Sequence, residues 1–343
     1  MADSKIEWLM GPDGKAGKTW NPLAGCSYQS PGCLNCYAMS MAVRLPTMGQ
    51  HKYDGTAVRK PGSKRPQWTG KINLGTADDL DLPLTWKKPK MIFVNSMSDL
   101  FHANVPEAFI DQVFVTMWAA QWHTFQVLTK RIERAADYLR RHDLPLRLAR
   151  AALAAMQRRE PEKAAIMSVS DFVDEFSHPL QNVLIGPSIE DQQRADERLP
   201  FADQIGELGW RVMISAEPLL GAIDFGLITR RAMNIAWLIV GGESGNLARP
   251  CHIDWIASIV NQCVLGNVPV FVKQTGKLVT IANDRASEWP NDGGDLIYPR
   301  DWRPHYQGED VEVRLQDKKG GTMSQWPKRI RLRQAPRPFE QSE

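Results

Sequence analysis

The sequence predicts an α/β fold, a partial (β/α) barrel with an inserted helical segment and a small C-terminal appendage. From residue 91 onward, short β-type runs alternate with helical patterns, which is typical of βα units around a parallel sheet. Polar residues follow almost every β-type run, as they do at the carboxyl ends of the strands in barrel enzymes. The chain has 343 residues, 43% of them hydrophobic, which is enough for one large domain with attachments or for two domains, and we favour the first.

Seven β-type runs are expected to form the barrel strands. They cover residues 19–24, 91–94, 124–128, 182–185, 211–214, 235–240 and 268–272. Helical patterns lie between them at 106–120, 132–141 and 253–265, and Pro106 followed by Glu107 is a typical start for the first of these helices. Seven strands joined by crossover helices predict a barrel that does not close.

Three segments fall outside this repeat. Residues 38–90 connect the first strand and the helix after it to the second strand. Residues 142–178, with Pro161 in the middle, predict two inserted helices that form a lid or a spacer, and residues 275–343 predict a small, partly β appendage. We therefore divide the chain into a barrel unit at 1–274 and an appendage at 275–343.

Basic side chains gather in two of these segments. Those at 58–90 surround Trp68 and Trp86, a mixture that could clamp a phosphate backbone while bases stack, or could equally form a solvated, lysine-rich loop. The basic residues are Arg59, Lys60, Lys64, Arg65, Lys71, Lys87, Lys88 and Lys90 in this segment, and Lys328, Arg329, Arg331, Arg333 and Arg337 near the C-terminus. The net charge of +3 and the pI near 8.5 fall short of the pI above about 9 that is typical of dedicated nucleic-acid-binding domains. Charge alone therefore does not identify the partner.

The N-terminal 20 residues are polar and glycine-rich, without the apolar core of a signal peptide. No apolar run approaches the roughly 18 residues that a membrane span requires. We therefore expect a cytoplasmic protein without membrane contact.

Three cysteines lie close together where the first β-type run ends, in the pattern Gly25-Cys26-x6-Cys33-x2-Cys36-Tyr37. The other two, Cys251 and Cys263, come more than 200 residues later. In a reducing compartment, such a group suits a metal or a cluster better than disulfides. Three thiolates under-fill a closed zinc site, but they can hold three irons of a four-iron cluster and leave the fourth iron open. Zinc remains an alternative if His51, His102 or Cys251 supplies a fourth ligand.

A helix is expected to begin just before the second of these cysteines, Cys33. Ser30 suits the cap and Pro31 the first turn, so that Cys33 and Cys36, three apart, would share one face. The positive end of the helix dipole would favour their thiolate forms. Cys26, at the end of the preceding strand, would complete a triangle of sulfurs.

The polar residues after successive strands are expected to share one floor at the mouth of the barrel. Any one group could be an ordinary solvated loop, but six in succession favour a common site. The candidates are Ser96, Ser98 and Asp99; Lys130 and Arg131; Ser188 and Glu190; Glu217; Gly241, Gly242 and Glu243; and Lys273. The cations Lys130, Arg131 and Lys273 would suit an anionic ligand, or would form ion pairs with the three glutamates of this set. His102 is a proton relay, a neighbour of the cluster or a packed side chain.

The cysteine loop resembles that of the radical S-adenosylmethionine (SAM) superfamily, whose usual C-x3-C-x2-C loop follows the first barrel strand and precedes a helix. Here six residues rather than three separate the first two cysteines. Longer phrases resemble an uncharacterised, phage-associated family of radical-SAM-like proteins that is sometimes associated with a three-cysteine-motif partner protein. The resemblance covers residues 19–336. Its main phrases are Thr19-Trp20-Asn21-Pro22, Asn35-Cys36-Tyr37-Ala38, Phe93-Val94-Asn95-Ser96-Met97-Ser98-Asp99, Ser215-Ala216-Glu217-Pro218 and Gly241-Gly242-Glu243-Ser244-Gly245.

The resemblance implies a [4Fe-4S] cluster on Cys26, Cys33 and Cys36, whose open iron binds SAM. An electron from the reduced cluster would cleave SAM to a 5′-deoxyadenosyl radical, with a flavodoxin or ferredoxin as the electron donor. Roles follow by position in the superfamily. Ser96, Ser98 and Asp99 are expected at the SAM amino group, Ser188 and Glu190 at the ribose, Gly241 and Gly242 where the backbone approaches a ligand, and Glu217 at the ligand or at a helix cap. Lys130, Glu243 and Lys273 are expected at the reacting substrate, although Glu243 could instead pair with Arg249.

The sequence therefore predicts a radical SAM enzyme that abstracts hydrogen from its substrate. The phage-associated setting, a loose resemblance to spore photoproduct lyase and the basic, tryptophan-bearing segments at 58–90 and 318–337 favour a nucleic acid or a nucleobase derivative. Two other interpretations stay open. One is a non-catalytic, zinc-stabilised nucleic-acid-binding protein, and the other is a degenerate barrel that uses its cluster as a redox sensor.

Overall fold

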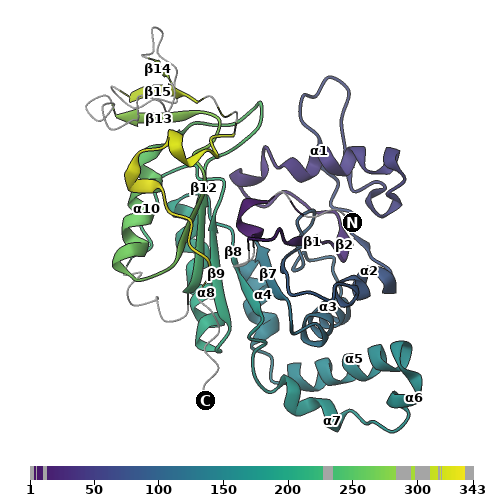
Figure 1. Ribbon diagram of the computed structural model, residues 1–343. Coiled ribbons are helices and arrows are strands. Elements are labelled where there is room, and N and C mark those ends of the chain that lie inside the picture. The colour runs from purple at the N-terminus through teal and green to yellow at the C-terminus, as the bar shows by residue number, and fades with distance from the viewer. Residues whose placement is uncertain are drawn as a thin grey trace.

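A curled sheet of seven parallel strands forms the centre of the protein (Figure 1). The computed structural model describes residues 4, 6–10, 14–226, 235–282, 295–297, 310–315, 317 and 319–336. The strand order is β1 (Lys18–Trp20), β6 (Met91–Val94), β7 (Thr124–Thr129), β8 (Val183–Pro187), β9 (Arg211–Ala216), β10 (Ile235–Gly241) and β12 (Val270–Gln274). Neighbours in space are neighbours along the chain, and β1 and β12 form the two ends of this order. The predicted partial (β/α) barrel is thus confirmed as a half-barrel.

Apart from the edge strand β1, the strands of the half-barrel are buried on both faces, which is why they are mostly apolar in sequence. Alternate residues such as Ile92 and Val127 face outward into the large core under the crossover helices. These helices are α3 (Glu107–Ala119), α4 (Ile132–Leu139), α8 (Gln192–Glu207) and α10 (Ile253–Leu265). The concave face holds a second cluster around Trp8 of η1 (Glu7–Leu9), whose ring lies 5.0 Å from Phe93 and 6.0 Å from Trp237. The N-terminal segment therefore fills part of the half-barrel's interior.

The first predicted strand, 19–24, is two strands in the structure. β1 joins the large sheet, whereas β2 (Leu23–Ala24) pairs antiparallel with β5 (Asn73–Leu74). Pro22 lies between them and has no N–H to donate to a sheet. The Asn21 side chain fills this break, since its Oδ1 accepts hydrogen bonds from Ser96 Oγ and Met97 N. The chain leaves the sheet here and enters the cysteine loop.

The connecting segment 38–90 forms small elements beside the half-barrel. They are α1 (Tyr37–Arg44), η3 (Pro46–Met48), η4 (His51–Tyr53), β3 (Ala57–Val58), β4 (Gln67–Trp68), α2 (Ala77–Asp81) and η5 (Leu82–Thr85). β3 and β4 pair as an antiparallel hairpin that packs against α1. Its loop projects above α1 at the upper right of Figure 1.

The inserted segment 142–178 is one long helix followed by short ones, rather than two helices. It consists of α5 (Leu144–Arg159), α6 (Pro161–Ala164), α7 (Ser170–Val173) and η6 (Asp174–Phe176). Pro161 begins α6, where its missing N–H costs nothing. α5 packs against α3 and lies at the end of the molecule away from α1 (Figure 1). In this position the insertion packs against α3 and does not cover the cysteines.

The C-terminal region contains a second, four-stranded sheet in the order β11 (Cys251–His252), β13 (Val279–Ala282), β15 (Asp310–Arg314) and β14 (Asp295–Ile297). After η8 (Met323–Gln325) and η9 (Lys328–Ile330) the chain returns to the barrel edge. There Gln334 O accepts a hydrogen bond from Trp237 Nε1, at 2.9 Å. Trp326 and Ile330 are buried in the same core as the barrel helices. The predicted small appendage thus packs directly onto the barrel. Within the described residues, no helix has the length and apolar character needed to cross a bilayer.

Candidate functional site

A cavity of about 370 Å³ opens where the strands of the half-barrel reach their carboxyl ends. Its wall combines the cysteine loop with residues that follow five of the strands, β6 to β10, and with the last two residues of β12. The lining includes Cys26, Cys33, Cys36, Ser96, Ser98, Asp99, Lys130, Ser188, Glu217, Gly242, Glu243 and Lys273. The structure therefore gathers the predicted site residues around one space, apart from Glu190 and Gly241, which lie behind the wall.

The cysteine loop is built differently from the predicted helix start. Cys33 ends a single 3-10 turn, η2 (Pro31–Cys33), and Cys36 is the residue before α1. Cys36 N donates to Cys33 O, at 3.2 Å, so a tight turn rather than a shared α-helical turn brings these two residues together. Ser30 precedes Pro31 as expected, but its side chain makes no capping hydrogen bond.

Gly25 sets the direction in which the loop leaves β2. Its φ is +99°, and a Cβ at this position would lie 2.1 Å from Lys71 O. Both the backbone conformation and the close neighbour require glycine. The residue after it, Cys26, is thereby held at the cavity wall.

The three sulfurs are arranged around the cavity without converging on one point. All five cysteines are free, and within the described residues no three His, Cys, Asp or Glu side chains are close enough to hold a single metal ion. A zinc site needs its ligands on one ion, whereas the thiolates of a four-iron cluster bind separate irons. The alternative zinc ligands do not line the cavity: His51 is exposed beside Asp54, His102 bonds to Ser27, and Cys251 is buried. Within the described residues the three cysteines thus lack the further ligand that a closed zinc site needs, and the [4Fe-4S] cluster stays a prediction.

Burial raises the pKa of two of the thiols, Cys26 and Cys36. It raises the pKa of Cys26 to about 12, with a further increase from Asp99, while the Arg131 guanidinium acts in the opposite direction. Burial also raises the pKa of Cys36, and the N–H groups of Ala38 and Met39 lower it only in part. For Cys36, the predicted effect of the helix start on the thiolate is therefore present but weaker than burial.

Asp99 and Arg131 fasten the first cysteine. Asp99 Oδ2 accepts from Arg131 Nη1, at 2.8 Å, and from Lys130 N, at 3.2 Å, while Oδ1 accepts from Thr129 Oγ1 and Phe101 N. Arg131 Nη1 also lies 3.8 Å from Cys26 Sγ. Both carboxylate oxygens of Asp99 are thus occupied by the protein. The expected contact between Asp99 and a SAM amino group stays a prediction, but the structure uses this carboxylate to position Arg131 beside a cysteine.

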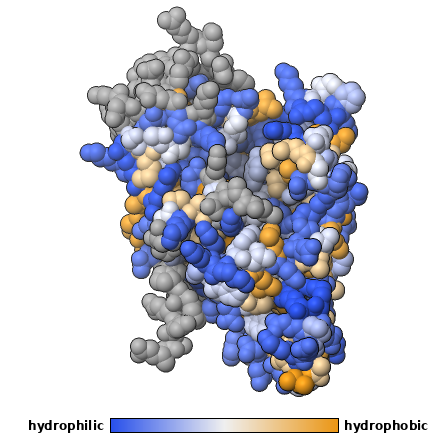
Figure 2. All heavy atoms as spheres, turned by 45° about the vertical axis from the view of Figure 1, so that its right-hand side comes forward, coloured by the Kyte–Doolittle hydropathy of each residue, from blue (hydrophilic) through white to orange (hydrophobic). Residues whose placement is uncertain are grey.

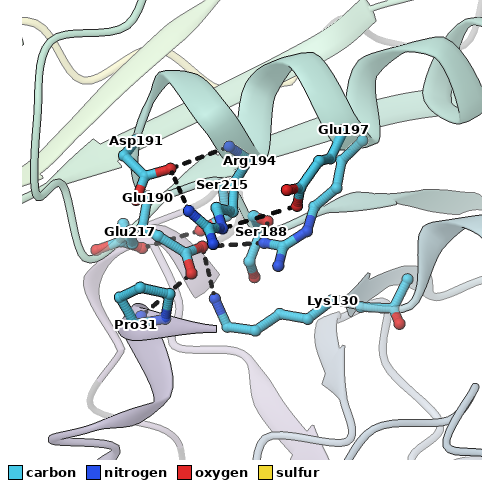
Figure 3. A network of polar contacts seen from close by, with 12 residues as sticks. Pro31, Lys130, Ser188, Glu190, Asp191, Arg194, Glu197, Ser215 and Glu217 are labelled. Carbon is cyan, nitrogen blue, oxygen red and sulfur yellow. Dashed lines mark hydrogen bonds and ion pairs between the residues drawn. The ribbon is translucent and has the colours of Figure 1, made fainter. Parts of the chain in front are cut away.

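Glu190 fastens the middle of the loop (Figure 3). It is fully buried, and its Oε1 accepts from Gly32 N, at 3.1 Å. Oε2 accepts from Lys130 Nζ at 3.0 Å and from Arg198 Nη1 at 2.9 Å. Burial alone would raise the pKa of Glu190, but Lys130 and Arg198 lower it to about 2. Glu190 therefore faces the loop and two cations, and not a ligand in the cavity.

Local structure fixes Glu190 in this position. β8 ends at Pro187, and Asp191 caps α8 by accepting a hydrogen bond from Arg194 N, at 3.0 Å (Figure 3). Only a short turn lies between the strand and the cap, so the side chain of Glu190 has one orientation. Gly32 fits this turn closely, because a Cβ there would lie 3.0 Å from Glu190 Cδ and from Lys130 Nζ.

Glu243 fastens the far side of the loop, and the predicted pairing with Arg249 is present. Arg249 Nη2 lies 2.6 Å from Glu243 Oε1, and Asn35 Nδ2 donates to Glu243 Oε2 at 2.9 Å. Arg249 Nη1 also donates to Pro31 O, at 3.0 Å. Burial opposes ionisation of Glu243, but the hydrogen bonds from Arg249 and Asn35 lower its pKa overall. Asn35 was not among the predicted residues, and nothing in its position between two cysteines distinguishes it from a solvated loop residue.

Glu217 and Lys273 form an ion pair that faces the cavity. Lys273 Nζ lies 3.1 Å from Glu217 Oε1, and the two side chains are 25% and 15% exposed. Neither contacts the cysteine loop through a hydrogen bond or ion pair within the described residues. Gly241 makes room for this pair, because a Cβ there would lie 2.8 Å from Glu217 Oε1. Gly242 instead permits close backbone packing, since its Cβ would lie 2.3 Å from Thr275 O. Both glycines thus have structural reasons that involve no ligand.

The hydroxyl groups expected at SAM have protein contacts of their own. Ser96 Oγ donates to Asn21 Oδ1, and Ser98 Oγ donates to Leu23 O at 3.0 Å. Ser188 lines the cavity next to Ser215, with which it forms a parallel β-bridge. These serines can still accept hydrogen bonds from a ligand.

Asn95 is another polar residue of the cavity wall that was not among the predicted site residues. It follows β6 in the left-handed region, with φ +62°, and it is only 3% exposed. Both its side-chain atoms, Oδ1 and Nδ2, are buried without a hydrogen-bond partner within the described residues. Buried amides are nearly always paired in proteins, so an unpaired amide at a cavity wall indicates a place for a polar ligand or water. The sequence signal that could have identified Asn95 was an asparagine directly after a β-type run, because asparagine tolerates the left-handed conformation better than most residues.

The basic residues of the C-terminal stretch hold the structure together. Arg329 Nη2 lies 2.7 Å from Asp254 Oδ1, Arg331 donates to Trp326 O, and Arg333 donates to Val272 O and Lys273 O. Arg337 lies outside the described residues. Because these arginines already bind backbone and carboxylate groups, this stretch offers less to a nucleic acid than its sequence implied.

Comparison with known proteins identifies a family without an assigned function. A family model described as "Protein of unknown function (DUF5131)" matches residues 3–323. Searches of curated proteins and of solved structures found no match. The activity must therefore be argued from the site itself.

Proposed function

The chain belongs to the DUF5131 family, and we propose that it is a radical SAM enzyme. The observation that carries this proposal is the placement of Cys26, Cys33 and Cys36 around one cavity at the carboxyl end of a parallel half-barrel. Three thiolates can hold three irons of a [4Fe-4S] cluster, and the fourth iron then needs a ligand from the cavity. The three cysteines are the residues that would hold the cluster.

The cavity suits a nucleoside-sized cofactor. Its volume of about 370 Å³ lies within the roughly 300–1,000 Å³ range of small-molecule sites. Asn95 offers an unpaired amide, while Lys273 and Glu217 together complement a ligand that carries both a carboxylate and an ammonium group. When bound, the cluster and SAM would supply a carbon radical that abstracts a hydrogen atom from the substrate.

The chain's own part in this chemistry is to hold the cluster loop rigid and to shield the cavity. Three carboxylates, Asp99, Glu190 and Glu243, each pair with a cation and each bind the loop or a residue that contacts it. Trp8, Phe93 and Leu128 provide an apolar wall beside the polar groups. Such a wall excludes water and limits side reactions of a radical with the protein.

The experiment is anaerobic reconstitution with iron and sulfide, followed by reduction in the presence of SAM. We expect about four irons per chain and the release of 5′-deoxyadenosine. Alanine in place of Cys33 should abolish both, whereas Cys263→Ala should retain both, because Cys263 is buried on α10 away from the cavity. A colourless protein that binds one zinc ion and leaves SAM intact would contradict the proposal and favour a zinc-stabilised binding protein.

A further inference from the structure

One strongly basic segment borders the cavity. We call it the basic hairpin, residues 57–71, which contains strands β3 and β4 and the loop between them. It carries five basic residues and no acidic residue. The basic residues are Arg59, Lys60, Lys64, Arg65 and Lys71.

The charges of the basic hairpin are not neutralised by the protein. Arg59 Nη1 donates to Lys64 O, at 2.9 Å, and Lys71 Nζ donates to Asp54 O, so two cations hold the loop through backbone carbonyls. Within the described residues, none of the five forms an ion pair with a carboxylate, and Arg59, Lys60 and Lys64 are exposed. The corresponding upper right of Figure 2 is mainly hydrophilic. Unpaired cations on a projecting loop attract an extended anion.

Aromatic side chains lie where the basic hairpin meets the cavity. Trp68, on β4, lines the cavity together with Cys36 and Tyr37. Tyr37 is 58% exposed, and its hydroxyl is anchored by donating to Ser96 O at 2.8 Å. Two aromatic side chains thus line the cavity with Cys36 of the cysteine loop, and a flat ligand can stack on such rings.

We propose that the basic hairpin binds single-stranded nucleic acid through its phosphates, and that Trp68 and Tyr37 stack an unpaired base at the cavity. The combination of a cationic track and aromatic platforms is the recognition mode of single-strand-binding proteins. A single strand is required because a base in a duplex presents no free face to these rings. This inference rests on the proposed function, since a base held beside Cys36 would be the substrate from which the enzyme abstracts hydrogen.

The other basic groups that the sequence singled out do not share this geometry where the structure describes them. Lys87 and Lys88 precede β6 and lie near the amino ends of the strands, whereas the cavity is at the carboxyl ends. The described arginines of the C-terminal stretch are engaged with backbone or carboxylate groups. The basic hairpin is therefore the part of the described chain that we assign to the nucleic acid.

The test compares two variants that remove the same charge. Lys60→Gln/Lys64→Gln changes the basic hairpin, and Lys87→Gln/Lys88→Gln changes two exposed lysines at the other end of the barrel. Binding of fluorescent oligo(dT) and oligo(U) is measured by anisotropy over a range of salt concentrations. We expect the hairpin variant to lose about tenfold in affinity at low salt. The slope of log affinity against log salt concentration should become shallower by about 1.4, because each of the two lost phosphate contacts on a single strand contributes about 0.7. The control variant should match the wild type.

Stacking is tested separately. Trp68→Leu should weaken binding by about tenfold and leave the salt slope unchanged, and Trp68→Phe should recover part of the loss. A preference for oligo(dT) or for oligo(U) would support the proposal and identify the kind of strand. Equal losses in the two lysine variants, no binding of either oligomer, or equally tight binding of polyglutamate would overturn it, the last because it would indicate an acidic protein partner.

These measurements are independent of the radical chemistry. The Cys33→Ala protein, which should lack the cluster, should still bind the oligomers through the basic hairpin. Conversely, Lys60→Gln/Lys64→Gln should retain its iron and cleave SAM without substrate. Failure of the proposed function and failure of this inference would thus give different results.

Discussion

Asn95 and Asp99 both follow β6 and both line the cavity, yet their polar atoms are used in opposite ways. The carboxylate of Asp99 accepts four hydrogen bonds from the protein. The amide of Asn95 has no partner within the described residues. A saturated group contributes to the fold, while an unsatisfied one lowers stability until a ligand or water pairs with it. At this scale, Asn95 is the better candidate for contact with the cofactor.

This contrast predicts the effect of Asn95→Gly. Glycine accepts the left-handed conformation and removes the unpaired amide, so the free energy of unfolding should stay the same or rise. The affinity of the reconstituted protein for SAM should fall about tenfold, because one or two hydrogen bonds worth roughly 0.5–1.5 kcal/mol each are lost. Equilibrium dialysis measures the affinity, and urea denaturation measures the stability.

Gln126 provides the matched control for Asn95. It also has a buried amide without a partner in the described chain, but it does not line the cavity. Gln126→Leu should therefore raise the stability and leave the SAM affinity unchanged. An Asn95→Gly protein that is destabilised but binds SAM normally would show that this amide serves the fold.

The cysteine loop is the element on which the site depends, and it is held from three sides. Arg131 binds beside Cys26, Glu190 binds Gly32, and Arg249 binds Pro31. Each contact joins the loop to a residue more than 90 positions away in the sequence. The loop has little regular structure of its own, so these contacts fix the positions of its three cysteines.

The central contact predicts a stability change with a defined pH dependence. Lys130 and Arg198 lower the pKa of the buried Glu190 from its ordinary 4.5 to about 2, despite the opposing effect of burial. Its stabilising effect is therefore fully present above about pH 4.5 and is lost as the pH falls towards 2. A shift of this size corresponds to about 3 kcal/mol, and Glu190→Gln should lose about that much at pH 7.

Urea denaturation at several pH values checks this expectation. The difference between wild type and Glu190→Gln should shrink as the pH is lowered from 4.5 towards 2, and the variant should bind less iron at neutral pH. The exposed Glu197, which lies in α8, supplies the control, since Glu197→Gln should change stability by at most about 0.5 kcal/mol. A Glu190→Gln protein as stable as the control variant would show that this pair does not hold the loop.

The strands and their order could be predicted from the sequence, because strands buried on both faces are apolar throughout and parallel neighbours follow one another along the chain. The cysteine turn could not. Ser30 and Pro31 are typical of a helix start, but Gly32 and Pro31 are bound by Glu190 and Arg249, and α1 begins only at Tyr37. Tertiary contacts therefore decide where the helix starts.

At the scale of the whole molecule, the half-barrel brings together residues that the sequence separates widely. The sequence indicated that strand-end residues would meet, because the carboxyl ends of parallel strands lie on one side of the sheet. It did not indicate which carboxylates would be neutralised by which cations, since those pairs link different strands and loops. It also left the C-terminal arginines and Trp86 as candidates for a binding surface beside the alternative of a solvated loop, whereas in the structure the basic hairpin with Trp68 is the part that borders the cavity.

The N-terminal segment and the C-terminal chain both pack onto the open half-barrel. Trp8 fills the interior from one side, and the C-terminal chain adds Arg333 to the edge strand β12 through a bridge with Phe271. The cysteine loop and the basic hairpin lie at the mouth. The half-barrel thus leaves one cavity that is lined by the three cysteines of the loop and by polar residues at the carboxyl ends of the strands.

Mössbauer spectroscopy of the iron-labelled, anaerobically reconstituted protein, recorded with and without SAM, tests the central claim most directly. The account predicts the spectrum of a four-iron cluster in which one iron differs from the other three and changes when SAM is added, because only three cysteines line the cavity. Protein that binds no cluster, or a cluster whose irons are all unaffected by SAM, would contradict it.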